Sequence, residues 1–477
     1  MRNMVITICL LAVFLEVSGL IFSVKSEGPT EVFLRLTQTP EVRLESPLHN
    51  GYFLLVGFAA DSEADPIQVG YEIWLEAEAH RGHRHFDFEK GARSALRITI
   101  GLDDVAPDWS AADPVRSFQE HGVTMRTSIT RYAVLVDRYR QWLSMPFEDW
   151  GFGHPASPRF AEIMAAHRLF IGDGFAQDAA IGSDRLRQDT IAWRRVLVEA
   201  KTIPMKIMAA TMVDDNLSLL SKTLARPNLE TPVLTVAKQI GHALTREEGA
   251  MRWPIQNEFV LGLARREDLL SVDNFVGTDE TDQNRQWLAQ KSGLHPDAFL
   301  KVQHPTSKTL LGMTLETQRT WDAYATYYDA LITSSAVLHS PLPRLHEVAK
   351  DSNRTLFEHL LNPIEFDPAW EPFTQRLLAT DARLRLTALQ VLMRSVLGTE
   401  RISERLSQAG PEYFDPFSGL PMLWSPSHRR LYSVGKDGLD DGGDSTFDIV
   451  TPALPDQGKL PGPLNRDRVR RAQHVSG

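Results

Sequence analysis

A long apolar run near the N-terminus constrains the fold of this chain more than any other feature. Met4 to Val24 (MVITICLLAVFLEVSGLIFSV) is a stretch of 21 residues in which Glu16 is the one charged residue. About 20 predominantly apolar residues are enough for a helix to cross the hydrocarbon core of a bilayer. No second run of this length follows, so the residues after Lys25 are all expected on one side of the membrane.

Two interpretations of residues 1–26 remain open. An uncleaved signal anchor would keep the segment in the membrane, and Arg2 before the run and Lys25 after it give a weak charge bias compatible with an inside N-terminus. A cleaved signal peptide would use Met4–Leu15 as its apolar region, but no clean A-x-A cleavage site follows. The anchor predicts a bacterial inner-membrane protein that contacts the membrane through residues 4–24, with a single pass and its bulk in the periplasm.

The composition indicates an ordinary globular protein. Of the 477 residues, 43% are hydrophobic and 23% are charged, which excludes a disordered or low-complexity chain. The 51 basic and 61 acidic residues give a net charge of −10, so no nucleic-acid partner is predicted. Cys9 is the one cysteine of the sequence, which excludes a disulfide framework and a multi-cysteine zinc site.

Residues 27–126 are predicted to form a mixed α/β region. Leu96–Ile100 alternates apolar and polar residues with period two, as a half-buried strand does. The apolar run Tyr52–Phe58 fits either a buried strand or the opening of a helix. Pro66–Ala79 is predicted to be a helix with Pro66 in its first turn.

Residues 127–380 are predicted to form an irregular multi-helix body, so the fold class is mainly α. One helix face is marked by residues that recur at spacings of four, three and four: Tyr132, Val136, Tyr139 and Leu143. Further helices are expected over 158–171, 184–201, 204–225, 231–245, 247–265, 283–291, 314–338 and 342–361. Trp321, Tyr324, Tyr327 and Tyr328 form an aromatic stripe at helical spacing, which is interpreted as core.

The sequence changes character after Gly410. Residues 415–421 (DPFSGLP) have the composition of a turn, and two short apolar segments, Met422–Trp424 and Arg430–Val434, follow on either side of a polar connection. Two short strands separated by such a connection are typical of a β-hairpin. Residues 452–477 are predicted to be an extended tail.

An acidic, glycine-rich loop follows the predicted hairpin. Its 12 residues contain five carboxylates: Asp437, Asp440, Asp441, Asp444 and Asp448. Calcium takes six to eight oxygen ligands on a flexible loop, so these side chains can converge on one hard cation. The loop lacks the residue order and the closing Glu of an EF-hand. A solvated loop without an ion remains the alternative.

The stretch DPFSGLPMLW…RRLYSVGKDGLDDGG resembles the C-terminal end of the major pseudopilins of type II secretion. It is closer still to large bacterial membrane-anchored proteins that carry this ending behind a helical body. The helix expected from Asp381 to Leu397 resembles the helix that precedes the hairpin in those proteins. The resemblance covers Asp381–Val450, about 70 residues or roughly 15% of the chain, and defines a predicted module over 381–451.

In the pseudopilins the segment YSxGxDG and the acidic loop after it hold a structural calcium ion. The resemblance therefore implies Ca²⁺ as a structural cofactor, with ligands drawn from Asp437, Asp440, Asp441, Asp444 and Asp448. The chain departs from the pseudopilins in two respects. It lacks a Gly cleavage site followed by Phe-Thr-x-x-Glu, and more than 350 residues separate its apolar segment from the hairpin. A processed pilus subunit is therefore not expected.

No catalytic residues are assigned from the sequence. The chain has no H-E-x-x-H, no G-x-S-x-G and no Walker-type phosphate loop. The histidine cluster His80–His85 fits a polar turn better than a metal site, because the two arginines within it repel a cation. We expect a membrane-anchored, periplasm-facing protein of binding or scaffolding type with a protein partner. The alternative is a periplasmic hydrolase whose site lies between the helical body and residues 50–100.

Overall fold

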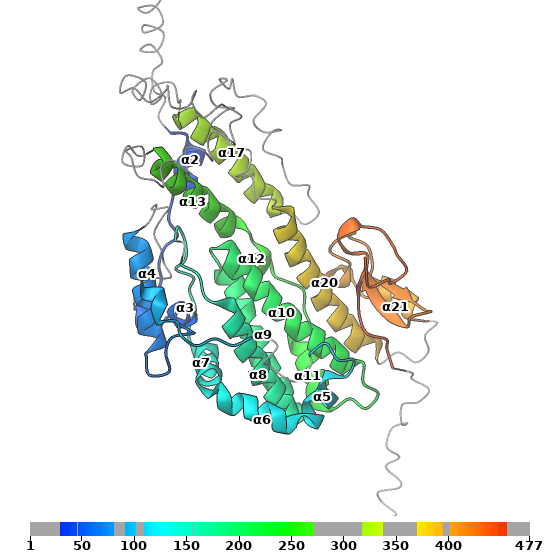
Figure 1. The fold of residues 1–477 in the computed structure, drawn as a ribbon. Helices are drawn as coiled ribbons and strands as arrows, with labels where there is room; N and C mark the ends of the chain where they lie inside the picture. The colour runs from blue at the N-terminus through cyan, green and yellow to red at the C-terminus, as the bar shows by residue number, and fades with distance from the viewer. Residues whose placement is uncertain are drawn as a thin grey trace, which may run out of the picture.

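The computed structural model describes residues 29–44, 46–80, 91–101, 109–154, 156–270, 317–336, 370–394 and 401–455. These residues are mainly helical and carry a small three-stranded antiparallel sheet near the C-terminus (Figure 1). None of the helices in these ranges is long and apolar enough to cross a membrane. Residues 4–24, where a membrane helix is predicted, lie outside the described ranges.

The first helices are short. They are α2 (Glu31–Leu36), the 3-10 helix η1 (Pro47–His49), α3 (Gly51–Val56), α4 (Pro66–Ala79) and the 3-10 helix η2 (Ala92–Ala95). Every residue of α3 is buried, and this helix resolves the ambiguous run Tyr52–Phe58. The predicted bounds of α4 are confirmed, because Asp65 accepts a hydrogen bond from the N–H of Ile67 and Pro66 occupies the first turn.

The prediction of a mixed α/β region over 27–126 is wrong for the described part of that region, which is helical. The alternating segment Leu96–Ile100 forms no strand. Leu96 makes an isolated antiparallel bridge to Ala60, and the N–H of Ile98 adds one hydrogen bond to the same segment. A ladder does not extend from this bridge, because the chain around Ala60 is a short turn between two helices and offers no second strand.

Three helices cover one end of the helical body, at the bottom of Figure 1. They are α5 (Pro114–Glu120), α6 (Gly122–Arg131) and α7 (Ala133–Ser144). The predicted helix face is confirmed for α7, since Val136 and Tyr139 are buried and Leu143 packs against the same core. Tyr132 is also buried, but it lies in the turn that separates α6 from α7.

Three long consecutive helices form the centre of the body: α8 (Phe160–Gln177), α9 (Ala179–Glu199) and α10 (Ile203–Leu224). The connections between them are so short that each helix packs antiparallel against the next. Each connection also supplies a helix cap. Asp178 accepts hydrogen bonds from the first turn of α9, and Thr202 accepts one from the N–H of Met205 in α10.

The remaining helices flank this centre. They are α11 (Thr231–Ile240), α12 (Arg246–Gly249), α13 (Arg252–Leu270), α17 (Thr317–Ser335), α20 (Glu371–Met393), α21 (Ile402–Ser407) and the 3-10 helix η9 (Pro411–Tyr413). The helix predicted from Asp381 starts ten residues earlier, at Glu371. The helices predicted over 283–291 and 342–361 lie outside the described residues, as do residues 81–85 of the histidine cluster and 456–477 of the tail.

The C-terminal sheet confirms the predicted hairpin and adds a third strand. β1 (Leu423–Ser425) pairs antiparallel with β2 (Arg430–Ser433), and β2 pairs antiparallel with β3 (Ile449–Val450). Tyr432 lies opposite Leu423 on one side and Val450 on the other. The acidic loop is therefore the connection between two adjacent strands.

Helix α20 joins this sheet to the helical body (Figure 1). Leu377 and Leu384 belong to the large hydrophobic cluster of the body, whereas Leu386, Leu389 and Met393 pack with the sheet. One helix thus contributes to two hydrophobic clusters, which fixes the C-terminal module on the body.

Candidate functional site

The acidic loop begins where β2 ends, with a 3-10 turn η10 (Gly435–Asp437), and returns to β3. Gly435 has φ +68°, and a Cβ atom at this position would lie 2.5 Å from the carbonyl oxygen of Phe447. Only glycine allows both the left-handed conformation and this close approach. The start and the end of the loop are consequently held together by the protein itself, without an ion.

Four of the five predicted ligands are exposed, and three of them bond to nearby donors. Asp437 accepts a hydrogen bond from the N–H of Leu439, and Asp444 accepts one from the N–H of Thr446. Asp440 accepts from the N–H of Gly442 at 2.9 Å and from the phenol of Tyr432 at 2.8 Å. Burial of the phenol is the main cause that raises the pKa of Tyr432, and the contact with Asp440 raises it further. The hydroxyl therefore remains a donor at neutral pH. Asp441 is exposed as well.

Asp448 differs from the other four because its side chain is buried. The residue is 5% exposed, and its Oδ2 accepts a hydrogen bond from the N–H of Gly443 at 2.8 Å. Its Oδ1 is buried and has no hydrogen-bond partner among the described residues. Burial raises the pKa of Asp448, the backbone N–H groups of Gly443 and Asp441 oppose that rise, and the negative charges of Asp441 and Asp440 add to it. The loop thus closes over a carboxylate oxygen whose hydrogen-bonding capacity is unused.

A second buried carboxylate of the C-terminal module, Asp415, is not predicted from the sequence. Asp415, 2% exposed, accepts hydrogen bonds from the hydroxyl of Ser433 and from the N–H groups of Phe417 and Val434. These contacts tie the turn before β1 to the end of β2, where the acidic loop starts. An Asp-Pro pair at the beginning of a turn was the available signal, since Asp side chains often bond to backbone N–H groups there.

The donor chemistry of the loop fits a hard divalent cation. Carboxylate oxygens are the ligands that calcium prefers, and the unpartnered Oδ1 of Asp448 lies next to the negative charges of Asp440 and Asp441. Within the described ranges, however, no three His, Cys, Asp or Glu side chains are gathered closely enough to form a preassembled metal site. Coordination would thus require side chains such as Asp440 to exchange local hydrogen bonds for the ion.

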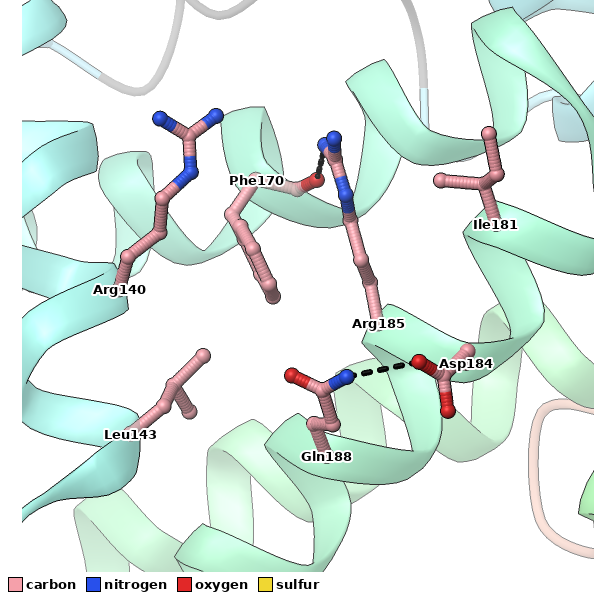
Figure 2. A pocket seen from close by; sticks show the side chains of 7 residues that line it. All are labelled: Arg140, Leu143, Phe170, Ile181, Asp184, Arg185 and Gln188. Carbon is pink, nitrogen blue, oxygen red and sulfur yellow. Dashed lines mark hydrogen bonds between the residues drawn. The ribbon is translucent and has the colours of Figure 1, made fainter.

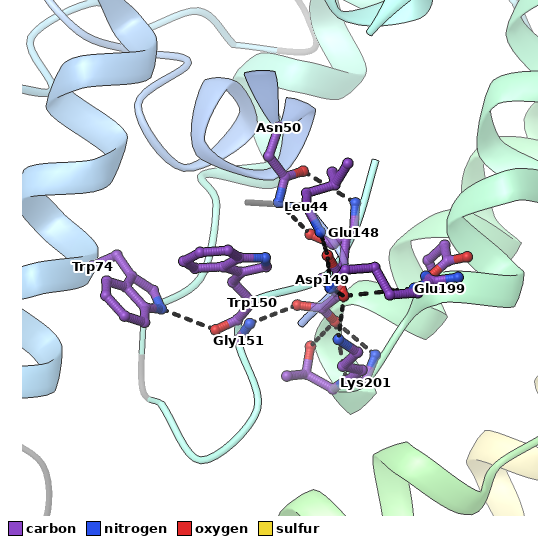
Figure 3. A network of polar contacts seen from close by, with 11 residues as sticks. Leu44, Asn50, Trp74, Glu148, Asp149, Trp150, Gly151, Glu199 and Lys201 are labelled. Atoms are coloured by element: carbon purple, nitrogen blue, oxygen red, sulfur yellow. Dashed lines mark hydrogen bonds and ion pairs between the residues drawn. The ribbon is translucent and has the colours of Figure 1, made fainter. Parts of the chain in front are cut away.

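A second group of buried carboxylates lies between the N-terminal helices and the helical body, where the hydrolase alternative expects its site (Figure 3). Glu148, 1% exposed, accepts hydrogen bonds from the backbone N–H groups of Arg43 and Leu44 and from Nζ of Lys201 at 3.2 Å. Asp149, fully buried, accepts from the N–H groups of Gly151 and Lys201. The pair ties the segment after α7 to the start of α10.

The acidity of these two groups follows from their surroundings. Burial alone would raise the pKa of Glu148, but the N–H groups of Leu44 and Arg43 and the Lys201 ammonium outweigh it and lower the pKa. For Asp149, burial outweighs its N–H donors and raises the pKa. Both carboxylates are engaged by internal donors, which accounts for their burial without a substrate.

A third polar cluster is enclosed by α7, α8, α9 and α10. The phenol of Tyr139 donates to Asp189 at 2.5 Å, Nδ1 of His167 lies 3.1 Å from the same carboxylate, and the Asn216 amide donates to its other oxygen at 2.8 Å. His167 and Asp189 are fully buried, and the rings of Trp109 and Tyr139 pack against the imidazole. This arrangement aligns four helices inside the core.

An open groove of about 340 Å³ lies on the surface between α7, α8 and α9 (Figure 2). It is lined by Arg140, Leu143, Phe170, Ile181, Asp184, Arg185 and Gln188. Arg185 donates to Asp173 and to the carbonyl oxygen of Phe170, and Asp184 pairs with Arg187. The Arg187 guanidinium lowers the pKa of Asp184, so these lining residues supply an ionised carboxylate and no group poised to transfer a proton at neutral pH.

Comparison with known proteins adds no family assignment. No family model, curated protein or solved structure matches the chain.

Proposed function

We propose that this chain is a membrane-anchored, periplasm-facing protein of binding or scaffolding type, whose C-terminal module is ordered by a calcium ion. Residues 4–24 would provide the anchor, in a single pass through a bacterial inner membrane. The ion would be held by ligands drawn from Asp437, Asp440, Asp441, Asp444 and Asp448. It would brace the loop between β2 and β3, as the pseudopilin resemblance implies, and would take no part in a reaction.

The observation that carries the calcium proposal is the unpartnered Oδ1 of Asp448. Burying a carboxylate oxygen without a donor costs stability, and the two neighbouring aspartates increase that cost. A divalent cation would neutralise the three charges together and give the buried oxygen a partner. Asp448 therefore distinguishes this loop from a merely solvated run of glycine and aspartate.

The geometry favours binding over hydrolysis. An active site needs groups with shifted pKa values that face a space for substrate. In the helical body, burial raises the pKa values of Asp149 and Asp214. Asp149 accepts hydrogen bonds from backbone N–H groups. Oδ2 of Asp214 pairs with Arg376 and Arg383, while its Oδ1 has no hydrogen-bond partner among the described residues. Neither aspartate lines the groove of Figure 2.

Thermal melting of the purified full-length chain tests the calcium proposal. A ligand that binds only the folded protein must stabilise it, so calcium should raise the melting temperature relative to a chelator. The shift should disappear in an Asp440→Ala/Asp441→Ala variant. A matched control, Glu404→Gln, removes an exposed carboxylate elsewhere in the module and should keep the full shift. Identical curves with saturating calcium and with chelator, for a folded wild-type chain, would overturn the calcium proposal.

The anchor is tested independently of the loop. Membranes that contain the full-length chain are washed with carbonate at high pH, and the N-terminus of the retained protein is sequenced. An anchored chain stays in the pellet and retains residues 4–24. Release into the supernatant, or a mature N-terminus after this segment, would contradict the anchor and support a cleaved signal peptide.

A further inference from the structure

The outer face of α9 carries a regular seam of residues. Ile181, Asp184, Gln188, Ile191, Arg195 and Val198 follow one another at spacings of three and four, which places them on one side of the helix. Its three large aliphatic side chains remain exposed, with exposed fractions of 42% for Ile181, 50% for Ile191 and 43% for Val198. Alternating spacings of three and four are the pattern by which one helix packs along another.

One charged residue of this seam has nitrogen atoms that no acceptor satisfies. The Nε and Nη2 atoms of Arg195 are buried and have no hydrogen-bond acceptor within the described part of the chain. Burial lowers the pKa of this guanidinium, which the charge of Glu199 offsets only in part. Glu199 itself forms an ion pair with Arg43. Because this chain itself covers those two nitrogens, a carboxylate from outside these residues would reach the partly exposed remainder of the Arg195 guanidinium rather than Nε or Nη2.

The seam is complementary to itself in the antiparallel direction. Consider two α9 helices that pair antiparallel about the midpoint between Gln188 and Ile191. Each residue then faces the residue of the other copy that lies equally far from the midpoint on its opposite side. Ile181 then lies opposite Val198, Asp184 opposite Arg195, and Gln188 opposite Ile191. A parallel pairing would instead set Asp184 against Asp184 and Arg195 against Arg195, which like-charge repulsion disfavours.

We propose that two copies of this chain associate through their α9 seams, antiparallel about a two-fold axis, with Asp184 of each copy bound to Arg195 of the other. A two-fold interface uses the same surface on both copies and therefore requires this self-complementarity. Asp184 is available for the contact. Its present partners, Arg187 and Gln188, lie on the same helix, and its side chain is 53% exposed.

The groove of Figure 2 fits the same arrangement. Its wall includes Ile181 and Gln188, which lie opposite Val198 and Ile191 of the second copy. Leu143 and Phe170 give the groove an apolar lining that exposed aliphatic side chains can enter. The pairing thus covers the exposed Ile191 and Val198, fills the groove and gives Arg195 a carboxylate. It depends on neither the calcium loop nor the membrane segment.

A charge-reversal series tests the association. The full-length chain is studied in detergent by analytical ultracentrifugation, in a Cys9→Ser background. Asp184→Arg and Arg195→Asp should each weaken the dimer at least tenfold, because each change creates two like-charge contacts per dimer. The double variant should recover the affinity to within about threefold, and Lys238→Asp, on the exposed face of α11, should leave it unchanged. A monomer at every concentration, or a double variant as weak as the single ones, would overturn the proposal.

Thiol cross-linking tests the direction of the pairing. Ile181→Cys and Val198→Cys are placed on differently tagged copies and treated with a short bifunctional maleimide. The mixture should give a cross-linked dimer, whereas Ile181→Cys alone should not, since the two copies of that position would lie about 26 Å apart along the helices. Cross-linking of Ile181→Cys with itself and not in the mixture would refute the antiparallel arrangement. Unchanged melting temperatures establish that the variants are folded.

Discussion

Replacing Lys206 is expected to stabilise the protein at neutral pH. Lys206 lies in α10, is 1% exposed, and its ammonium donates to the carbonyl oxygen of Leu197 at 2.6 Å. The nearby carboxylate of Glu248 is already bound by the guanidinium of Arg194 at 2.6 and 2.7 Å. Burial therefore dominates and lowers the pKa of Lys206 from 10.5 to about 7, while the charge of Glu248 opposes this only in part.

The pH dependence follows from this lowered pKa. Between pH 7 and 10.5 the unfolded chain holds a proton on this amine that the folded chain releases, so stability rises as the pH rises through this window. A tenfold change in proton affinity corresponds to about 1.4 kcal/mol, so the charged amine costs roughly 5 kcal/mol at and below pH 7 as an upper limit. Lys206→Met removes this cost but loses the hydrogen bond to Leu197, and a net gain of about 1–4 kcal/mol is expected near pH 7.

Urea unfolding at several pH values, followed by tryptophan fluorescence, measures this effect. The unfolding free energy of Lys206→Met should exceed that of the wild type near pH 7, and the difference should shrink toward pH 10.5. Lys238→Met, which replaces an exposed lysine of α11, should reproduce the wild-type curve. A difference between Lys206→Met and wild type that does not vary over this pH window would refute the argument, because the amine would then have an ordinary pKa.

Two further substitutions test features of the fold by thermal or urea unfolding. Gly435→Ala should cost more than Gly442→Ala, because both have φ near +70° but only the new Cβ at Gly435 would meet the Phe447 carbonyl oxygen; equal losses would contradict this steric account. Arg138→Met should destabilise the protein by about 3–5 kcal/mol. The reason is that this guanidinium, in a residue that is 6% exposed, donates to four backbone carbonyls between α3 and α4. Arg126→Met, at an exposed position, should change the stability by less than about 0.5 kcal/mol. Similar values for the two arginines would contradict the assigned role.

Helices whose signals are local could be predicted from the sequence. The adjacent residues Asp65 and Pro66 mark the start of α4, and Thr202 marks the start of α10. Features that depend on residues distant in the sequence could not be predicted in this way. Leu96–Ile100 has the alternation of a strand, but whether a strand forms depends on a neighbouring strand, and the segment around Ala60 offers only one bridge.

In the candidate site, too, local features could be predicted from the sequence, whereas features that depend on distant residues could not. The spacing of acidic residues and glycines identified the loop, because ligand type and chain flexibility are local properties. The sequence could not show that Asp448 is buried while Asp437, Asp440 and Asp444 are exposed, since that depends on how β3 returns beside β2. The two-residue strand β3 is itself too short to give a periodic signal.

Asp448→Asn provides the most direct test of the calcium account. The substitution keeps the shape of the side chain but removes a charge that burial and the neighbouring aspartates destabilise. The account predicts a higher melting temperature without calcium and no further rise when calcium is added. Asp444→Asn, at an exposed position whose pKa is lowered by the N–H of Thr446, should not raise the calcium-free value. An Asp448→Asn variant that keeps the full calcium shift of the wild type would contradict the account.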